Sequence, residues 1–173
     1  MAKNMKNPRS TVEELRRFLA YDSNTGSITW LVARGRLAKI GQVAGSIDSK
    51  GHRQIKVHGE TFMAHQIAWA LHFGVWPFHQ IDHQDGDRDN NKINNLRPAT
   101  NSQNAQNRKM RKDTLTGKKG VRKNGSRWSA RIQVNGKRVC IGTFRTVGEA
   151  HDAYQREAFR LFGEYANFGE SHD

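Results

Sequence analysis

The sequence predicts an α+β protein that consists of two small modules joined by a basic linker. The chain of 173 residues is long enough for one full domain or two small ones. Short strand-like runs lie between two helical patterns in its first part, and its last part follows the order strand, strand, strand, helix. We expect a tail at 1–10, a first module at 11–107, a linker at 108–116, a second module at 117–169 and a tail at 170–173.

The first module begins with a helix whose N-cap is Ser10 or Thr11, depending on whether Glu13 or Glu14 completes the capping box. Strand-like runs follow, separated by turn residues and glycines. A second helix is predicted over 61–74, because apolar side chains recur at four-residue spacing and Gly74 ends the pattern. The strand-like runs are 27–31, 42–47 and 54–57.

The second module contains two hairpin signals, Asn124-Gly125 and Asn135-Gly136, because both residue types tolerate positive φ. A helix over 147–162 follows, with Thr146 as its N-cap and Glu149 completing a capping box. One face of the middle strand is apolar and the other is polar and basic. The predicted strands are 119–122, 128–134 and 138–144.

The charge of the chain indicates a polyanionic partner. It has 29 Lys and Arg against 16 Asp and Glu, a formal net charge of +13, and nucleic acid is the default partner at this charge. No run approaches the roughly 18 apolar residues of a membrane span. The basic start of the chain lacks the apolar region of a secretory signal, and the single Cys140 excludes an intrachain disulfide framework and a cysteine-based zinc knuckle. We expect an intracellular protein.

An acidic run within this basic chain is the most informative segment. Four of the nine acids in residues 1–107 lie between Asp82 and Asp89, which indicates a cation site. An EF-hand loop fails in both possible registers, although Asx turns remain an alternative for 87–95. Zinc is disfavoured, because His79 and His83 are four residues apart in an extended segment rather than on a helix.

A hydrolytic site for a hard metal fits the residue types best. The carboxylate of Asp82 would bind Mg²⁺, and the imidazole of His83 would take a proton from water. Neighbouring residues of a strand point to opposite faces, so a twisted edge or a bulge is needed to bring both side chains to one site. Asn104, on a following helix, would supply a second metal oxygen.

These residues resemble the HNH endonucleases in their phage homing form, over 11–107. The match is Asp82-His83-x-Asp85-Gly86, then Asn95-Leu96-Arg97, then Asn104, with a similar lead-in from Ala64 to Pro77. The resemblance implies a ββα-metal unit of two antiparallel strands and a helix. It implies that Asp82 and Asn104 hold one Mg²⁺ or Mn²⁺ ion and that His83 is the general base. Asn95 would tie the loop and orient His83, or act only as a structural Asx residue.

Asn104 stands where many members of that family have His, and its amide oxygen favours Mg²⁺ or Mn²⁺ over zinc. His65 is expected to be a buried or supporting histidine. Arg97 either clamps the scissile phosphate or lies in solvent.

The second module resembles an AP2 DNA-binding domain over 117–169. The resemblance rests on Gly120-Val121-Arg122, the run 128–132, the run 141–144 and the helix pattern that follows. It implies a three-stranded antiparallel sheet in the major groove, backed by one helix. The side chains expected to face DNA are Arg122, Arg127, Trp128, Arg131 and Arg138, and Trp128 has an equally strong interpretation as a core residue.

Together these features predict a metal-dependent endonuclease that nicks duplex DNA and is targeted by the second module. A DNA-binding regulator without catalytic activity is the alternative. We expect a monomer without an obligate protein partner, encoded by a phage or prophage and acting in the cytoplasm of a bacterial host. The linker is expected to follow the DNA backbone or a minor groove through its basic side chains, which are Arg108, Lys109, Arg111 and Lys112.

Overall fold

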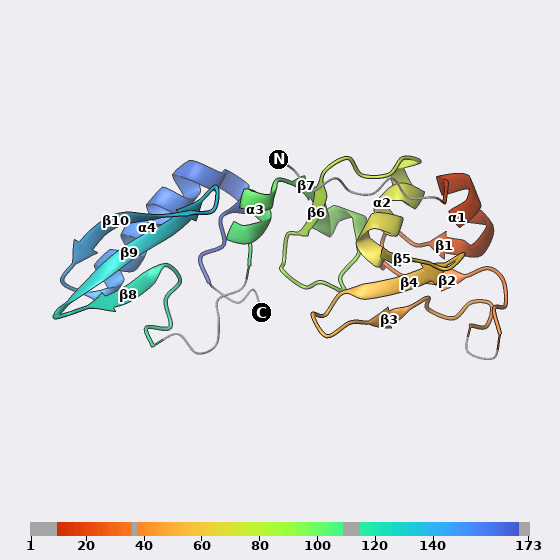
Figure 1. Cartoon of the computed structure of the whole chain (residues 1–173), viewed down its shortest axis with the longest axis horizontal. Helices are drawn as coiled ribbons and strands as arrows, with labels where there is room; N and C mark the ends of the chain where they lie inside the picture. Colours follow the sequence, from red (N-terminus) through yellow and green to blue (C-terminus); the bar gives the residue numbers. More distant parts are fainter. Residues whose placement is uncertain (1–9, 36–37, 109–114, 170–173) are drawn as a thin grey trace. The chain divides into compact units, whose positions relative to one another are not determined.

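The computed structural model describes residues 10–35, 38–108 and 115–169. The chain divides into two compact units, Met1–Pro98 and Ala99–Asp173, each with its own core (Figure 1). The division falls earlier than the linker expected at 108–116. Of that expected linker, residues 109–114 lie outside the described residues.

The first unit consists of short elements arranged around one core. In its described residues, helix α1 is followed by two small sheets, of orders β1-β2 and β3-β4-β5, and helix α2 is followed by a third, β6-β7. The elements are α1 (Val12–Phe18), β1 (Leu19–Tyr21), β2 (Ile28–Trp30), β3 (Ser46–Ile47), β4 (Arg53–Val57), β5 (Glu60–Met63), α2 (Ala64–Phe73), β6 (Gln80–His83), the 3-10 turn η1 (Ile93–Asn95) and β7 (Leu96–Ala99).

The predicted ends of the first unit's two helices are confirmed. Thr11 is the N-cap of α1, and its capping box is with Glu14. Gly74 ends α2 with φ 75°, in the left-handed region that favours glycine. The core of the unit includes Ile67 of α2, Ile81 of β6 and Leu96 of β7, which anchor the last hairpin to the helix.

Two predictions for the first unit were wrong at the level of individual residues. The segment 61–63 was assigned to the second helix but belongs to β5, where Phe62 pairs with Ile55 and is buried in the core. The run 42–47 was assigned to one strand, but only Ser46–Ile47 is strand. Gly45 interrupts it with φ 83°, at a point where a β-carbon would lie 2.1 Å from the Gln54 carbonyl oxygen.

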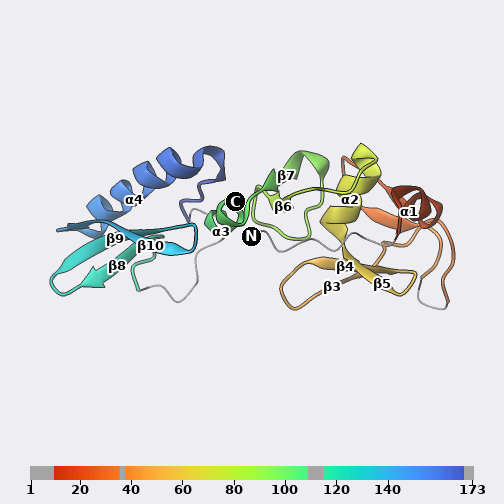
Figure 2. The same ribbon diagram turned by 45° about the horizontal axis from the view of Figure 1, so that its top comes forward.

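The second unit is a three-stranded antiparallel sheet, order β10-β9-β8, with one helix along one face (Figure 2). The short helix α3 (Asn101–Gln106) precedes it. The other elements are β8 (Val121–Asn124), β9 (Arg127–Val134), β10 (Lys137–Phe144), α4 (Val147–Phe162) and the 3-10 turn η2 (Gly163–Tyr165). The three strands and the helix expected over 117–169 are therefore present, within two residues at each end.

The core of the second unit lies between α4 and the sheet. It contains Ala130 and Ile132 from β9 and Ala150, Ala153 and Tyr154 from α4. The small alanines let the helix approach the sheet closely. No helix within the described ranges is long and apolar enough to cross a membrane.

We predict that Gly120→Ala destabilises the second unit by about 3 kcal/mol. Gly120 has φ 77°, and a β-carbon there would lie 2.1 Å from the ring of buried Tyr154, so backbone strain adds to overpacking. Gly117→Ala is the matched control, because Gly117 has φ 58° with open space around it and should lose only about 1 kcal/mol. Urea unfolding measures both values, and equal losses would contradict the packing argument.

Candidate active site

Asp82 and His83 are consecutive, buried residues at the end of β6, and each has a different partner. The Asp82 carboxylate accepts hydrogen bonds from the Arg97 guanidinium of β7, with Nε at 3.1 Å and a terminal nitrogen at 3.0 Å from Oδ2. Only 6% of the Asp82 side chain and 10% of the Arg97 side chain are exposed. The prediction that Arg97 lies in solvent is therefore wrong. Its guanidinium is buried against Asp82 and is not exposed to a phosphate in this structure.

The His83 ring contacts Asn91, a residue of the loop that joins β6 to η1. The Nε2 atom of His83 and the Oδ1 atom of Asn91 are 3.3 Å apart, and both residues are buried. This contact joins the loop to β6. The sequence predicted Asn95 as the residue that orients His83, but the side chain in contact with the ring is that of Asn91.

Three histidine rings come together at His83. Its ring centroid lies 5.1 Å from that of His65 on α2, edge to face, and 6.3 Å from that of His52. Burial lowers the pKa of His83, opposed by the Asn91 hydrogen bond and nearby carboxylates. Burial, with the His83 and His52 rings beside it, lowers the pKa of His65 to about 3. The cluster is therefore neutral at pH 7, and a neutral His83 can accept a proton.

Asn95 ties the loop, as the resemblance implied, through the residues that follow His83. Its Nδ2 donates to Asp85 Oδ1 at 3.0 Å and to the Asn90 carbonyl at 2.8 Å, and its Oδ1 accepts from the Asp85 backbone N–H at 3.1 Å. Burial raises the pKa of Asp85, but hydrogen bonds from Asn90, the Asp87 backbone and Asn95 outweigh it and lower the pKa overall. Asn95 thus joins Asp85, two residues after His83, to Asn90 of the same loop.

The other acids of the run hold the loop in shape. Asp87 Oδ1 accepts from the Asp89 backbone N–H at 3.1 Å, which is an Asx turn. The Asp89 carboxylate pairs with Arg53 of β4 at 2.9 and 2.8 Å. Asx turns are thus confirmed for the loop, and only Asp82 of the four acids lies on a strand of the candidate site.

The oxygen donors of the predicted site are of the types that a hard metal ion prefers. Within 10–35, 38–108 and 115–169, no group of three His, Cys, Asp or Glu side chains could hold a metal. Asp82 and Asn104 offer a carboxylate and an amide oxygen, the hard donors that Mg²⁺ and Mn²⁺ take together with water and substrate phosphate. These are the donor types of a magnesium-type ion, which takes water and substrate phosphate as further ligands.

Asn104 lies on α3, in the second unit, whereas Asp82 and His83 belong to the first. The C-terminal end of α3 is held by Lys119, whose Nζ donates to the carbonyls of Gln106 at 2.5 Å and Arg108 at 2.8 Å. Burial lowers the pKa of Lys119 to about 8, and an ammonium at this end of a helix is favourable. The Gln106 side chain also donates to the Gln133 carbonyl of β9, so α3 is fixed to the sheet unit.

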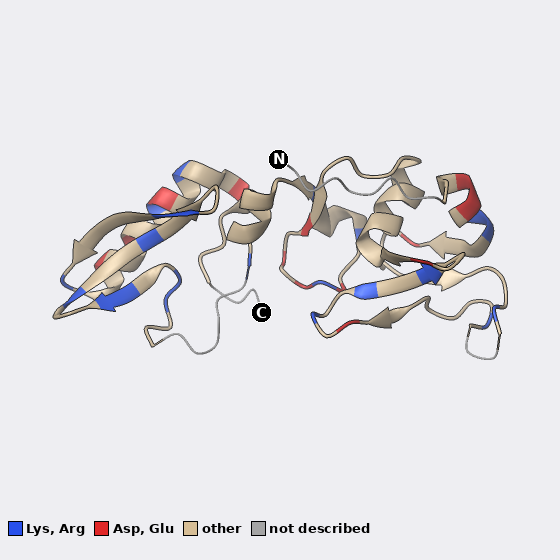
Figure 3. Cartoon of the chain, in the orientation of Figure 1, with Lys and Arg blue, Asp and Glu red and all other residues tan. Residues whose placement is uncertain are grey.

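The face of the sheet that α4 leaves open carries the predicted arginines. Arg122 pairs with Ser129, and Arg138 with Gln133, so both share a face with Arg131. Figure 3 marks the Lys and Arg positions along the chain in blue. Arg127 follows the same alternation, and all four arginines are exposed. The open face is thus defined by Arg122, Arg127, Arg131 and Arg138.

Trp128 does not lie with these arginines. It is half-buried and packs against the core beneath α4, since it alternates with Ala130 and Ile132. The core interpretation is therefore the one that the structure supports. Of the linker residues, Arg108 is exposed, and Lys109, Arg111 and Lys112 lie outside the described residues.

Sequence reasoning missed two residues near His83. Asn91 is one of several asparagines in a short run, and no spacing distinguishes it from Asn90 or Asn94. His52 precedes β4 in a segment without a motif, and only the fold brings its ring beside His65. The Nδ1 atom of His52 is buried without a hydrogen-bond partner.

Comparisons with known proteins agree with the resemblance to HNH endonucleases. Residues 62–106 match the model of a family described as HNH endonuclease, and this segment contains Asp82, His83, Asn95 and Asn104. The chain is 39% identical over 87 residues to an uncharacterised HNH endonuclease of Acanthamoeba polyphaga mimivirus. The match covers 50% of this chain and 44% of that relative, so the chain spans less than half of its length. No solved structure matches significantly. Both matches are to HNH endonucleases.

We predict that His65 makes the first unit sensitive to acid. Its pKa is about 3 in the folded state and about 6.5 in the unfolded state, so below pH 6.5 the unfolded chain binds a proton that the folded chain does not. The contribution of neutral His65 to the free energy of unfolding is fully present above pH 6.5. It falls by up to about 1.4 kcal/mol per pH unit as the pH is lowered.

The measurement is the free energy of unfolding between pH 7 and pH 4 for wild type and His65→Phe. The variant keeps an aromatic ring but cannot titrate, so its dependence on pH should be flatter. His79→Phe is the control, because His79 is exposed. If the free energy of unfolding depends on pH equally in wild type and His65→Phe, His65 is not buried in its neutral form.

Proposed function

We propose that this chain is a metal-dependent endonuclease that hydrolyses phosphodiester bonds in duplex DNA. The observation that carries the proposal is the buried pair Asp82-His83 on β6, within the segment that matches HNH endonucleases. A viral origin fits the mimiviral relative, and we propose a phage-type homing enzyme that acts inside the host cell.

His83 is the general base of the proposed reaction. Its neutral imidazole takes a proton from water, the water oxygen forms a bond to phosphorus, and the bond from phosphorus to the 3′ oxygen breaks. The products are a 5′-phosphate and, once the 3′ oxygen is protonated, a 3′-hydroxyl.

Asp82 and Asn104 would hold one Mg²⁺ or Mn²⁺ ion, which supplies charge stabilisation to the phosphate in the transition state. Arg97, beside Asp82, holds the carboxylate in its orientation through two hydrogen bonds. One such site serves one strand, so a monomer would nick.

The open face of the sheet is the proposed DNA-holding surface, in the manner of an AP2 domain. A three-stranded sheet is narrow enough for the major groove, and arginine is the side chain that best reads guanine edges. The four exposed arginines on one face account for much of the charge that DNA binding requires.

We predict that His83→Ala and Asn104→Ala each reduce cutting by at least about 100-fold, because they remove the base and a metal ligand. Both should bind DNA as wild type does, and EDTA should stop wild-type cutting. His79→Ala, which changes an exposed histidine four residues earlier, is the control. Digestion of supercoiled plasmid and of phage or host DNA gives the rates, and mapping the ends on both strands identifies nicking.

Full activity of purified His83→Ala would contradict the assignment. Retardation of DNA without cutting in Mg²⁺ or Mn²⁺ would favour the alternative, a DNA-binding regulator that uses the open face alone.

We further predict that Arg131→Ala weakens DNA binding by about 5- to 100-fold, since arginine contacts in a groove contribute about 1–3 kcal/mol each. Arg156→Ala removes the same charge from the exposed side of α4 and should change affinity less than about twofold. Fluorescence anisotropy with labelled duplex in EDTA measures both. Equal effects of the two variants would show that the open face does not bind DNA.

A further inference from the structure

We propose that Asn91 is the positioning residue of His83 and that the hairpin of β1 and β2 holds Asn91 in place. The side-chain amide of Asn91 would fix which ring nitrogen of His83 carries the proton. This inference rests on the function proposed above, because it concerns the base of that reaction. The hairpin, residues 19–30, precedes the segment 62–106 that matches the HNH family, so the match assigns it no role.

The orientation of the Asn91 amide follows from its second contact. The atom that faces the Asp89 carbonyl oxygen, at 2.9 Å, must be the Nδ2 donor, because a carbonyl only accepts hydrogen bonds. The Oδ1 atom therefore faces Nε2 of His83, at 3.3 Å. Since an amide oxygen also only accepts, Nε2 must carry the ring proton.

The tautomer identifies the reacting atom. A neutral imidazole has one protonated nitrogen, so a proton on Nε2 leaves the lone pair on Nδ1. Nδ1 is then the atom that takes the proton from water while the water oxygen attacks phosphorus. After that transfer both ring nitrogens carry protons, and Asn91 Oδ1 still accepts from Nε2, so the hydrogen bond persists through the step.

The backbone of Asn91 is fixed by the first hairpin. The Tyr21 hydroxyl donates to the Asn91 carbonyl oxygen at 2.8 Å. Two residues later, the Ile93 N–H donates to the Ser23 carbonyl oxygen at 3.2 Å. Burial raises the pKa of Tyr21 to about 12, so its hydroxyl remains a donor at neutral pH.

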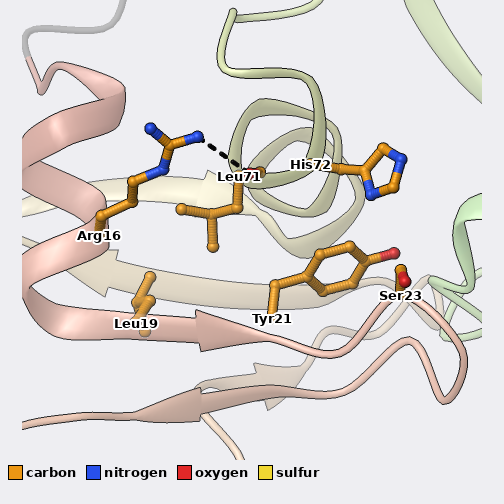
Figure 4. A pocket seen from close by; sticks show the side chains of 6 residues that line it. All are labelled: Arg16, Leu19, Tyr21, Ser23, Leu71 and His72. Carbon is orange, nitrogen blue, oxygen red and sulfur yellow. Dashed lines mark hydrogen bonds between the residues drawn. The ribbon is translucent and has the colours of Figure 1, made fainter.

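Gly26, in the turn of the hairpin, packs directly against the backbone of Asn91 and Lys92. Gly26 has φ 77°, and a β-carbon there would lie 2.5 Å from Lys92 N and 2.7 Å from the carbonyl carbon of Asn91. Any larger residue would therefore push Asn91 away from the turn. Tyr21 also lines a pocket of about 300 Å³, together with Arg16, Leu19, Ser23, Leu71 and His72 (Figure 4).

The first test reads the tautomer directly. Nitrogen-15 NMR of the histidine rings in the metal-free full chain should show His83 protonated at Nε2. Asn91→Ala should mix the two tautomers, whereas Asn91→Asp keeps an oxygen toward the ring and should restore the Nε2–H form. Asn94→Ala is the matched control, because Asn94 is an exposed asparagine of the neighbouring turn η1 and should leave the His83 signals unchanged.

The second test is kinetic. Asn91→Ala should lower kcat for plasmid nicking in Mg²⁺ by about 10- to 100-fold, the loss known for residues that orient metal-binding histidines. Its KM for DNA should stay within about twofold, since Asn91 is buried. Tyr21→Phe, which removes one hydroxyl, should lower kcat several-fold in the same direction.

The outcomes separate this inference from the proposed function. Suppose that the wild-type protein cuts DNA and that Asn91→Ala keeps both the wild-type kcat and the wild-type tautomer of His83. That result would overturn the role of Asn91 and leave the proposed nuclease function intact. Absence of cutting by wild type would overturn the nuclease, and the NMR test would still decide the tautomer. If Asn91→Ala does not fold, a His83 ring protonated at Nδ1 in wild type, or an unchanged kcat in Tyr21→Phe, would overturn the inference.

Discussion

The structure of the first unit depends on burying two polar neighbours, Asp82 and His83, on a strand of only four residues. Removing such groups from water is costly unless each finds a partner. Arg97 of the adjacent strand pairs with Asp82, and Asn91 of the connecting loop contacts His83. The loop must therefore fold back onto β6, and the network around Asp85 and Asn95 gives it the shape to do so. A two-stranded sheet alone is too small to provide this shelter.

The same constraint explains why acids gather in a basic chain. Asp85 and Asp87 accept hydrogen bonds from backbone N–H groups of the loop, and Asp89 pairs with Arg53. These three carboxylates therefore hold the loop in its conformation. Asp82 is then the carboxylate of the run that lies beside the candidate base. The basic surplus is found elsewhere, including the four arginines of the open face. Charge that would hold DNA and charge that would hold a metal are thus carried by different elements.

The sequence predicted correctly those elements that depend on interactions between residues a few positions apart. The capping box at Thr146, the helix 147–162 and the hairpin turn at Asn135 follow from residue types a few positions apart, and the structure has each of them. Phe62 was misplaced because its strand pairing with Ile55 depends on a segment that no local pattern identifies. The site was found only in part for the same reason. Asp82 and His83 stand in a motif, whereas Asn91, His52 and Tyr21 acquire their roles through contacts across the fold.

The most direct test of the account is the location of the metal relative to this pair. Anomalous diffraction from crystals of the full chain grown with duplex DNA and Mn²⁺ would locate the ion. The account predicts one peak about 2.1 Å from a carboxylate oxygen of Asp82, with His83 Nδ1 directed at the adjacent phosphate. A peak at another site, or a DNA phosphate remote from His83 with no ion at Asp82, would contradict it.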